Sequence, residues 1–527
     1  MTSSAVLAPD PPREPFPLRV ADPASFRQVE RALRSAGFDE NTICRVLGIS
    51  SMADFGTVGR DDLDLKTNAS KTFALVTRLF LFVEAVPREE VLQAIDGATL
   101  DAFLALDLLR RRVATTGTEE YYSPVLLYPV AGLLVASDRH ETVDGSPFVP
   151  EPDAVFPAIF AGTLRFLRLL PRSAAWDVLD LCAGTGIGAM VLSQQARRAV
   201  AADITPRAAH FARFNSRLNG CHNVEVAQGD LYEAVAGRTF DRIVAHPPYV
   251  PAAIDTQIFR DGGETGETVL RRVIAGLPEF LRRGGTFYAL CAGWDAKDGP
   301  FEERVRHWLG AAHEQFDVLF ALHHEMSPAD VARGLSARAS SDEPSQVSHW
   351  QHRFEAAGVE RRVYGALVVD RRTVGADAAR GHAITRRLRL SPLTEGPAFE
   401  WLLSWLRWRE TQEAQGAFAR LLLGVSPRLS PHAQVNVAYV PQAHGLAAAD
   451  VVLETDRPFA ALTRIDPWMF HLVTRFDGER TAEQVYVDAR DAGELADGFA
   501  VNDFTALVAL LIERGYVDVD NRLLRAD

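Results

Sequence analysis

Two consecutive prolines directly follow an apolar, strand-like run in the sequence FDRIVAHPPYVP, residues 240–251. Proline lacks an N–H group and cannot sit inside a helix or a central strand, so Pro247 and Pro248 end the strand. The carbonyls around them lack N–H partners and can accept hydrogen bonds from a planar –NH2 group. His246 supplies a second acceptor, and Tyr249 offers an aromatic face to a flat base, an amide or a sulfonium ion. The segment predicts a substrate clamp, and a turn that merely ends a strand is the alternative.

A glycine-rich turn follows another strand-like run in the sequence VLDLCAGTGIGAM. The run ends in Asp180, and Gly184, Gly186 and Gly188 precede a helix-like stretch. Glycines let the backbone turn tightly and approach a ligand closely. A dinucleotide site is the rival interpretation, because its G-x-G-x-x-G sequence stands at the same place. The glycine spacing here, Gly184-x-Gly186-x-Gly188, differs from that pattern and does not favour binding of a pyrophosphate.

Carboxylates end the next two strand-like runs, with Asp203 after AVAA and Asp230 after VAQG. The carboxyl ends of successive parallel strands face one crevice, so these acids and Asp180 should form a row there. Asp203 could take both hydroxyls of a ribose. Such a row suits a ligand that has a ribose and a positive centre but no phosphate, and S-adenosylmethionine fits that description. The alternative is that these acids are loop caps and helix N-caps.

Five segments together resemble the class I S-adenosylmethionine-dependent methyltransferases. They are DLCAGTGIG, AADITPRAAHFARFNSRLNG, GDLYEA, FDRIVAHPPYVP and RDGGETGETVLRRVIAGLPEFLRRGG, within about residues 150–325. The sequence looks most like the branch with an (Asn/Asp)-Pro-Pro-Tyr motif. That branch includes the release-factor glutamine N5-methyltransferases, the ribosomal RNA guanine-N2 enzymes and the adenine-N6 enzymes.

The resemblance implies S-adenosylmethionine as the cofactor and assigns roles to individual residues. The clamp that holds the acceptor nitrogen would be His246, Pro247, Pro248 and Tyr249. The expected cofactor site consists of Asp180, Cys182, Ala183, Gly184, Thr185, Gly186, Asp203, Ile204, Asp230, Leu231 and His246.

His246 departs from the pattern of that branch, which has Asn or Asp at this position. A neutral imidazole accepts one hydrogen bond, and a protonated imidazole accepts none. The acceptor atom of the substrate therefore stays open, because His246 could instead deprotonate a hydroxyl or an amine. After the clamp, the sequence RDGGETGE contains glycines that would allow a loop to move, while Arg260 and Glu264 could touch substrate or be solvated loop charges.

Alternating strand-like and helix-like runs position these residues. We expect an α/β fold with a doubly wound, mostly parallel, Rossmann-like methyltransferase sheet, flanked by two mainly α winged-helix-like domains. The expected division is a disordered N-terminus (1–20), an N-terminal winged-helix-like domain (21–145), the methyltransferase domain (146–375) and a C-terminal helical, winged-helix-like domain (376–527). The segment AFEWLLSWLRWRETQEAQGAFARLLL predicts one long helix with a packed stripe of Trp401, Trp405 and Trp408.

Composition limits the function classes. The chain has 527 residues, 47% hydrophobic and 24% charged residues and a net charge of −13, which disfavours a protein-wide polyanion-binding surface. The four cysteines lie far apart without a C-x-x-C pair, so we expect a reduced, cytoplasmic protein without a zinc ribbon. The histidines form no ligand-spaced cluster, so we expect no metal. No apolar run approaches the roughly 18–20 residues of a membrane span.

These observations favour a methyltransferase that acts on a nitrogen of a macromolecule, either a ribosomal RNA or other nucleic-acid base or a protein glutamine amide. The flanking domains could hold nucleic acid, and RRR at 110–112 and TRRLRL at 385–390 are candidate patches. They could equally hold a protein or peptide, and the C-terminal module is similar to winged helices that bind peptide leaders. Alternatives are a small-molecule N- or O-methyltransferase and a non-catalytic scaffold with a methyltransferase fold. Nothing in the sequence indicates an oligomeric state.

Overall fold

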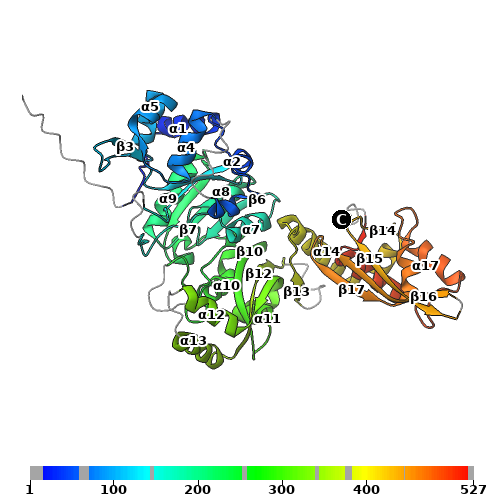
Figure 1. Ribbon diagram of the computed structural model, residues 1–527. Coiled ribbons are helices and arrows are strands. Elements are labelled where there is room, and N and C mark those ends of the chain that lie inside the picture. Colours follow the sequence, from blue (N-terminus) through cyan, green and yellow to red (C-terminus); the bar gives the residue numbers. More distant parts are fainter. Residues whose placement is uncertain are drawn as a thin grey trace, which may run out of the picture. The chain divides into compact units, whose positions relative to one another are not determined.

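The computed structural model describes residues 16–58, 70–142, 148–251, 258–338, 344–373, 383–443 and 445–519 (Figure 1). The chain divides into two compact units. The first contains Met1–Leu167, Trp176–Arg238 and Val244–Asp261, and the second contains Arg168–Ala175, Thr239–Ile243 and Gly262–Asp527.

Short capped helices begin the first unit. Asp22, Asp39, Ser70 and Asp96 each accept hydrogen bonds from the first helical N–H groups of α1, α2, α4 and α6. The elements are α1 (Pro23–Ser35), α2 (Glu40–Leu47), η1 (Met52–Thr57), α4 (Lys71–Phe80), α5 (Arg88–Ala94) and α6 (Gly97–Ala105), a sheet in the order β1-β3-β2 (Val86–Pro87, Glu119–Tyr122, Arg110–Val113), and the hairpin β4 (Leu126–Val130) with β5 (Leu133–Ser137).

The expected disorder at residues 1–20 is wrong for the part that the structure describes, which begins at residue 16. Leu18 is fully buried, and the Arg19 N–H donates to the Leu106 carbonyl at 2.9 Å. The apolar Leu18 side chain joins the hydrophobic core of the first unit, and this burial orders the backbone around it.

The first unit also contains the strands that carry the predicted cofactor site. These strands pair in the order β9-β6-β7-β8, and only the last residues of β9 belong to the first unit. The elements are α7 (Ala161–Leu169), β6 (Ala175–Leu181), α8 (Ile187–Ser193), β7 (Ala196–Asp203), α9 (Pro206–Leu218), β8 (Val224–Gln228), η2 (Leu231–Val235) and β9 (Phe240–Ala245). Strands β7 and β8 pair in parallel, from Ala199 opposite Val224 to Asp203 opposite Gln228.

The strands of the second unit pair in the order β13-β11-β12-β10-β9, where β9 contributes its first residues. Strand β12 pairs antiparallel with β10 and β11, whereas β13 pairs in parallel with β11. Its elements are α10 (Thr268–Phe280), β10 (Leu281–Ala296), α11 (Phe301–Trp308), η3 (Gly310–Gln315), β11 (Phe316–Met326), α12 (Pro328–Arg338), α13 (Pro344–Ala356), β12 (Val359–Arg371) and β13 (Thr385–Arg389). The predicted α/β, Rossmann-like, mostly parallel fold class is confirmed.

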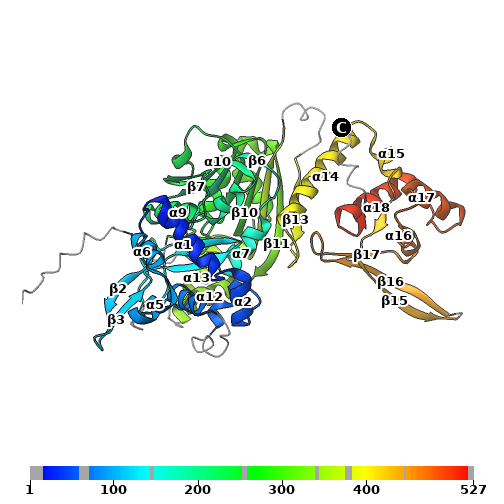
Figure 2. The same cartoon turned by 90° about the horizontal axis from the view of Figure 1, so that it is seen from above.

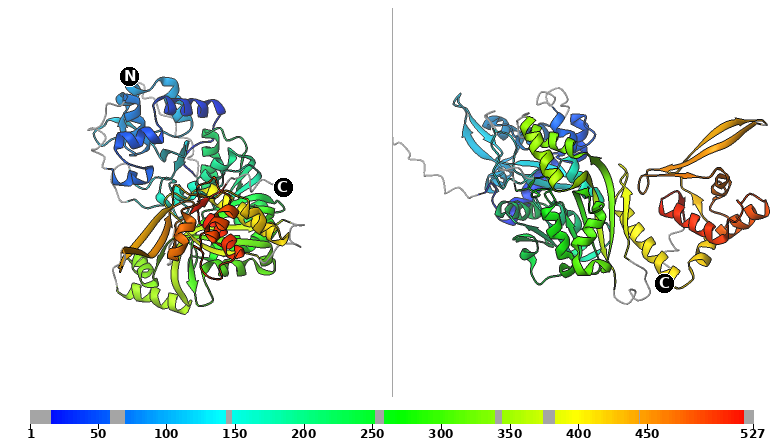
Figure 3. Two further views of the ribbon diagram at one scale, coloured as in Figure 1. Left: turned by 90° about the vertical axis from the view of Figure 1, so that its right-hand side faces the viewer. Right: turned by 90° about the horizontal axis from the view of Figure 1, so that it is seen from below.

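The C-terminal part of the second unit combines helices with a long ribbon. Strands β15 and β16 form an extended hairpin, drawn in orange in Figures 2 and 3. The elements are α14 (Gly396–Ala414), α15 (Phe418–Leu423), β14 (Arg428–Leu429), β15 (Gln434–Gln442), β16 (Gly445–Thr455), β17 (Ala461–Ile465), η4 (Pro467–Met469), α16 (Phe470–Val473), α17 (Ala482–Asp491), α18 (Val501–Glu513) and β18 (Val517–Asp518). The two winged-helix-like assignments and the four-part domain division stay predictions.

The single long helix expected after residue 397 is instead two helices. Gly416 has φ +67°, a left-handed conformation that ends α14 before α15 begins. The tryptophan stripe packs as expected: neighbouring ring centroids lie 6.2 and 5.3 Å apart along Trp401, Trp405 and Trp408, and the last two side chains are buried. Among the described residues, no helix combines the length and apolarity needed to cross a membrane.

A buried asparagine on α9 connects the N-terminal hairpin to the glycine turn of the first unit. The Asn215 side chain accepts from the Ala136 N–H at 2.8 Å and donates to the Ala136 and Thr185 carbonyls, both at 3.0 Å. The hydrophobic core of this unit likewise contains residues of both the N-terminal helices and α9, with the Phe26 and Phe214 rings 5.2 Å apart. The elements before residue 140 are therefore packed together with the strands of the predicted site.

We expect Asn215→Ala to lower the free energy of unfolding of the first unit by about 3 kcal/mol, because it leaves buried backbone groups without partners. Urea unfolding followed by circular dichroism measures the effect. Asn502→Ala is the matched control, since Asn502 is exposed and should change stability by about 0.5 kcal/mol or less. Equal midpoints for the two variants would contradict this role of Asn215.

Candidate functional site

In the glycine turn that follows β6, every second residue from Cys182 to Gly186 has a left-handed backbone conformation. Cys182, Gly184 and Gly186 have φ values of +57°, +52° and +79°, and the Gly186 N–H donates to the Ala183 carbonyl at 2.8 Å. A Cβ atom at Gly186 would lie 2.9 Å from the Cβ of Ala212, so this glycine allows α9 to pack closely. A Cβ atom at Gly184 would meet no described atom within 4 Å, which leaves open space for a ligand beside that backbone.

Asp180 lies beneath this turn rather than beside the open space. The side chain is 2% exposed, and its Oδ2 accepts from the Ala189 N–H at 2.8 Å in the first turn of α8. A Cβ atom at Gly188 would lie 2.6 Å from that oxygen, so only glycine fits there. Burial, with a smaller contribution from the charge of Asp203, raises the pKa of Asp180 to about 7. Asp180 thus supports the beginning of α8, and its predicted place in the cofactor site stays a prediction.

Asp203, the last residue of β7, connects the glycine turn to the start of α9. Its Oδ2 accepts from the Gly184 N–H at 2.9 Å, and its Oδ1 accepts from the Thr205 N–H at 3.1 Å. The Thr205 hydroxyl in turn accepts from the Ala208 N–H at 3.0 Å and caps α9. Burial raises the pKa of the Asp203 carboxyl. The neighbouring Ile204 is 51% exposed, an apolar side chain in position to contact a flat ligand.

Backbone hydrogen bonds hold the ends of three strands together. The Ala183 N–H donates to the Ala202 carbonyl at 3.1 Å, and the Gly229 N–H donates to the Asp203 carbonyl at 3.0 Å. Asp230 follows Gly229 at the beginning of η2, and Leu231 has φ +52°. Left-handed backbone at a residue other than glycine is unusual, and such strain concentrates at functional sites.

The clamp begins directly after β9. The His246 ring stacks with Phe166 at 5.4 Å and with Tyr249 at 5.9 Å, with interplanar angles of 26° and 27°. Although the residue as a whole is partly exposed, its imidazole lies deep among protein atoms, and this desolvation lowers the pKa of His246 to about 4. Pro247 is buried, while Pro248 and Tyr249 keep partial exposure. His246 is therefore neutral at physiological pH and retains one acceptor nitrogen.

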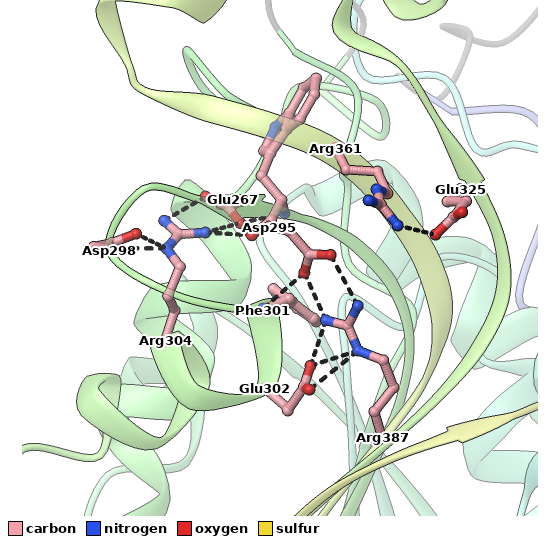
Figure 4. A network of polar contacts seen from close by, with 10 residues as sticks. Glu267, Asp295, Asp298, Phe301, Glu302, Arg304, Glu325, Arg361 and Arg387 are labelled. Atoms are coloured by element: carbon pink, nitrogen blue, oxygen red, sulfur yellow. Dashed lines mark hydrogen bonds and ion pairs between the residues drawn. The ribbon is translucent and has the colours of Figure 1, made fainter.

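Residues 262–267 of the glycine-rich loop after the clamp belong to the second unit. A polar network that includes Glu267 holds this part of the loop (Figure 4). The Thr265 carbonyl accepts from Trp294 Nε1 at 2.8 Å and from Arg362 Nη1 at 2.9 Å. Glu267 pairs with Arg304 at 2.8 Å. A Cβ atom at Gly263 would lie 2.1 Å from the Thr268 hydroxyl oxygen, so this glycine serves close packing. The exposed Glu264 makes no contact that assigns it a role in the site.

Comparisons with known proteins agree with this arrangement. Residues 155–293 match the family model of the methyltransferase small domain. A putative protein N5-glutamine methyltransferase of Methanocaldococcus jannaschii is 36% identical over 155 residues, which are 28% of this chain and 77% of that protein. The chain belongs to the class I S-adenosylmethionine-dependent methyltransferases.

Two further relatives of this methyltransferase carry names that specify a substrate. The release factor glutamine methyltransferase of Koribacter versatilis is 32% identical over 186 residues, 32% of this chain and 65% of that protein. The ribosomal protein uL3 glutamine methyltransferase of Bradyrhizobium diazoefficiens is 28% identical over 242 residues, 43% of this chain and 72% of that protein. The chain therefore spans slightly less than two thirds of the Koribacter enzyme.

The geometry fits the cofactor of the family, S-adenosylmethionine. The open side of Gly184, the Asp203 carboxylate and the exposed Ile204 lie at adjoining strand ends of the first unit. The individual cofactor contacts stay proposals for all eleven predicted residues, which are Asp180, Cys182, Ala183, Gly184, Thr185, Gly186, Asp203, Ile204, Asp230, Leu231 and His246. Within the described ranges, no group of three or more His, Cys, Asp or Glu side chains is arranged to hold a metal ion.

Three residues that shape this site were not predicted from the sequence. Thr205 positions Asp203, Phe166 stacks on His246, and Asn215 binds the Thr185 carbonyl. The Thr-Pro pair at 205–206 is a helix-start signal that could have identified Thr205. No local signal marks Phe166 or Asn215, because their roles depend on contacts with distant segments.

We expect Asp203→Ala to weaken the binding of S-adenosylhomocysteine by at least about 30-fold, because it removes a charged acceptor and frees the Gly184 N–H. Isothermal titration calorimetry measures the dissociation constant. Asp177→Ala is the matched control, since Asp177 lies near the beginning of the neighbouring strand, β6, and pairs with Arg198 at 2.8 Å. Unchanged affinity of the Asp203 variant would refute this site.

Proposed function

We propose that this enzyme transfers the methyl group of S-adenosylmethionine to the side-chain amide nitrogen of a glutamine in a protein substrate. The observation that carries the proposal is the clamp, in which a neutral, ring-stacked His246 stands immediately before Pro247 and Pro248. The names of the three relatives support a glutamine amide as the acceptor.

The clamp suits a planar –NH2 group because its backbone offers carbonyl acceptors without N–H donors at the two prolines. The His246 and Pro247 carbonyls are each followed by a proline, which has no N–H. The unprotonated nitrogen of the neutral imidazole is a further acceptor. Two N–H groups held in this way would orient the amide nitrogen, and Tyr249 would cover one face of the amide.

Orientation is the main contribution we assign to His246. When bound, S-adenosylmethionine supplies an electrophilic methyl group on a positively charged sulfur. An imidazole with a pKa of about 4 is a weak base, so it would hold the amide N–H without removing the proton in the ground state. Once the nitrogen has been methylated, it would release this proton to water. Asp203 and the glycine turn would hold the ribose portion of the cofactor at the ends of β6 and β7.

Charge pairing supports a protein substrate over a nucleic acid. In the candidate patch at 110–112, Arg110 pairs with Asp107 at 2.5 Å and Arg112 with Glu120 at 2.9 Å. In the second patch, Arg387 pairs with Asp295 and Glu302 (Figure 4), and Arg386 pairs with Glu513. The charges of these four arginines are paired within the protein, so these four side chains contribute little attraction for phosphates.

We further propose that the segments on either side of the methyltransferase strands help to hold the substrate protein. The hairpin of β15 and β16 supports this for the C-terminal segment, since Tyr439, Val440 and Leu446 are 53%, 44% and 69% exposed. Exposed large apolar side chains gathered on one element are a common feature of protein-binding surfaces.

The low pKa of His246 predicts that its ionisation does not appear in the pH dependence of methyl transfer between pH 5.5 and 8. Activity should fall only as the pH approaches about 4, because the protonated ring loses its acceptor nitrogen. The turnover number as a function of pH, together with an NMR titration of the ring, measures this. An inflection near pH 6.5 that disappears in His246→Asn would contradict the assignment.

The reaction itself is tested by incubating the enzyme and methyl-labelled S-adenosylmethionine with an extract of cells that lack the enzyme. We expect label in protein, and N5-methylglutamine after proteolytic digestion and mass spectrometry. A Tyr249→Ala variant should lose most of the labelling, because the acceptor amide loses its stacking partner. Label found in RNA or small molecules instead of protein would overturn the proposed substrate.

A further inference from the structure

Three phenylalanine rings form a stacked surface beside the clamp in the first unit. Phe156 stacks with Phe160 at 4.5 Å and with Phe259 at 4.9 Å, and both pairs have interplanar angles of 21°. Phe156 and Phe160 are each 38% exposed. The Arg260 guanidinium lies over the Phe259 and Phe156 rings, at 5.1 and 5.7 Å from their centroids. We call Phe156, Phe160 and Phe259 the aromatic wall.

The segment that carries two of these rings is held by the N-terminal hairpin. Asp138, which follows β5, donates its N–H to the Val155 carbonyl at 3.2 Å and accepts from the Val155 N–H through Oδ2 at 2.8 Å. The hydroxyl of the fully buried Tyr128, on β4, accepts from the Ala158 N–H at 2.7 Å. These contacts hold the backbone on both sides of Phe156, at Val155 and Ala158.

The aromatic wall also connects directly to the clamp. The Val250 N–H donates to the Arg260 carbonyl at 3.0 Å, and Val250 forms an isolated parallel bridge with Asp261. The Ile258 N–H donates to the Pro152 carbonyl at 3.1 Å, which joins the two segments that make up the wall. Tyr249 of the clamp is therefore adjacent in sequence to Val250, and Val250 binds the backbone of Arg260, the residue that follows Phe259 of the aromatic wall.

Exposed, mutually stacked aromatic rings provide a large rigid contact area at low entropic cost, and aromatic residues are enriched where proteins bind other proteins. The charges around the wall indicate which partner fits. The segments 148–161 and 258–261 contain three acids, Glu151, Asp153 and Asp261, and one base, Arg260, which lies over the rings. Arg207 pairs with Asp153 at 3.9 Å, so these acids are partly balanced, and the surface suits apolar or basic side chains of a polypeptide.

We propose that the aromatic wall binds the protein segment that carries the methylated glutamine, and that it thereby determines which glutamines reach the clamp. This inference rests on the proposed function. The segment would pack apolar side chains, or the aliphatic parts of basic ones, on Phe156 and Phe160, while its glutamine extends to His246 and Tyr249. Phe156 and Phe160 determine which substrate segment binds, and they do not contact the reacting atoms.

The test compares Phe156→Ala and Phe160→Ala with the wild type in the labelled-extract assay, over a range of protein concentrations. We expect the labelling rate at low substrate concentration to fall about tenfold in each variant and to recover at high concentration. Affinity for S-adenosylhomocysteine should be unchanged, which shows that the cofactor site is folded, and Phe156→Tyr should restore the rate. Trp176→Ala is the matched control, because Trp176 is 64% exposed in the same unit and also lies beneath an arginine, Arg197.

Each outcome has one meaning. If wild-type enzyme labels protein and the two alanine variants label it equally well at all concentrations, the aromatic wall has no role and the proposed function stands. If wild-type enzyme labels no protein, both inferences are overturned. If the variants lose labelling of RNA, the wall stacks nucleobases and the polypeptide assignment is wrong.

Discussion

The buried hydrogen bond between Asp180 and the Ala189 N–H is the contact on which the cofactor side of the site depends. It attaches the end of β6 to the first turn of α8, and Gly188 permits it because any side chain there would collide with the carboxylate. With both ends of the turn fixed, the Gly184 N–H is presented to Asp203 and the open side of Gly184 faces away from protein atoms. The two acids therefore have different contacts: Asp180 holds the beginning of α8, and Asp203 holds the Gly184 and Thr205 N–H groups.

The N-terminal segment contributes to the site through the same kind of buried polar contact. Asn215 joins the hairpin strand β5 to the Thr185 carbonyl, and Tyr128 and Asp138 hold the segment that carries Phe156. The cofactor turn and the aromatic wall are therefore positioned by one hairpin.

Local patterns predicted the parts of this protein that local physics determines. Strand and helix alternation, the glycine turn and the acids at strand ends follow from periodicity and backbone conformation, and the fold class was predicted correctly. The long helix after residue 397 was predicted wrongly because a single left-handed glycine, Gly416, outweighed a strong helical pattern. The glycines at 262–266 suggested movement, yet Trp294 and Arg362, distant in sequence, hold that loop. Contacts of this kind leave no signal near the residues they constrain.

His246, which precedes Pro247 and Pro248, is best understood together with the aromatic rings that it contacts. A carboxylate at this depth would lose its hydration, whereas a neutral imidazole can lie between Phe166 and Tyr249 with its ring faces on aromatic carbon. The same apolar surroundings that lower the pKa of His246 keep its acceptor nitrogen available at physiological pH. Compared with Asn or Asp, the imidazole brings aromatic contacts to Phe166 and Tyr249 and keeps one acceptor nitrogen. Phe166 is thus part of what makes histidine compatible with an amide clamp.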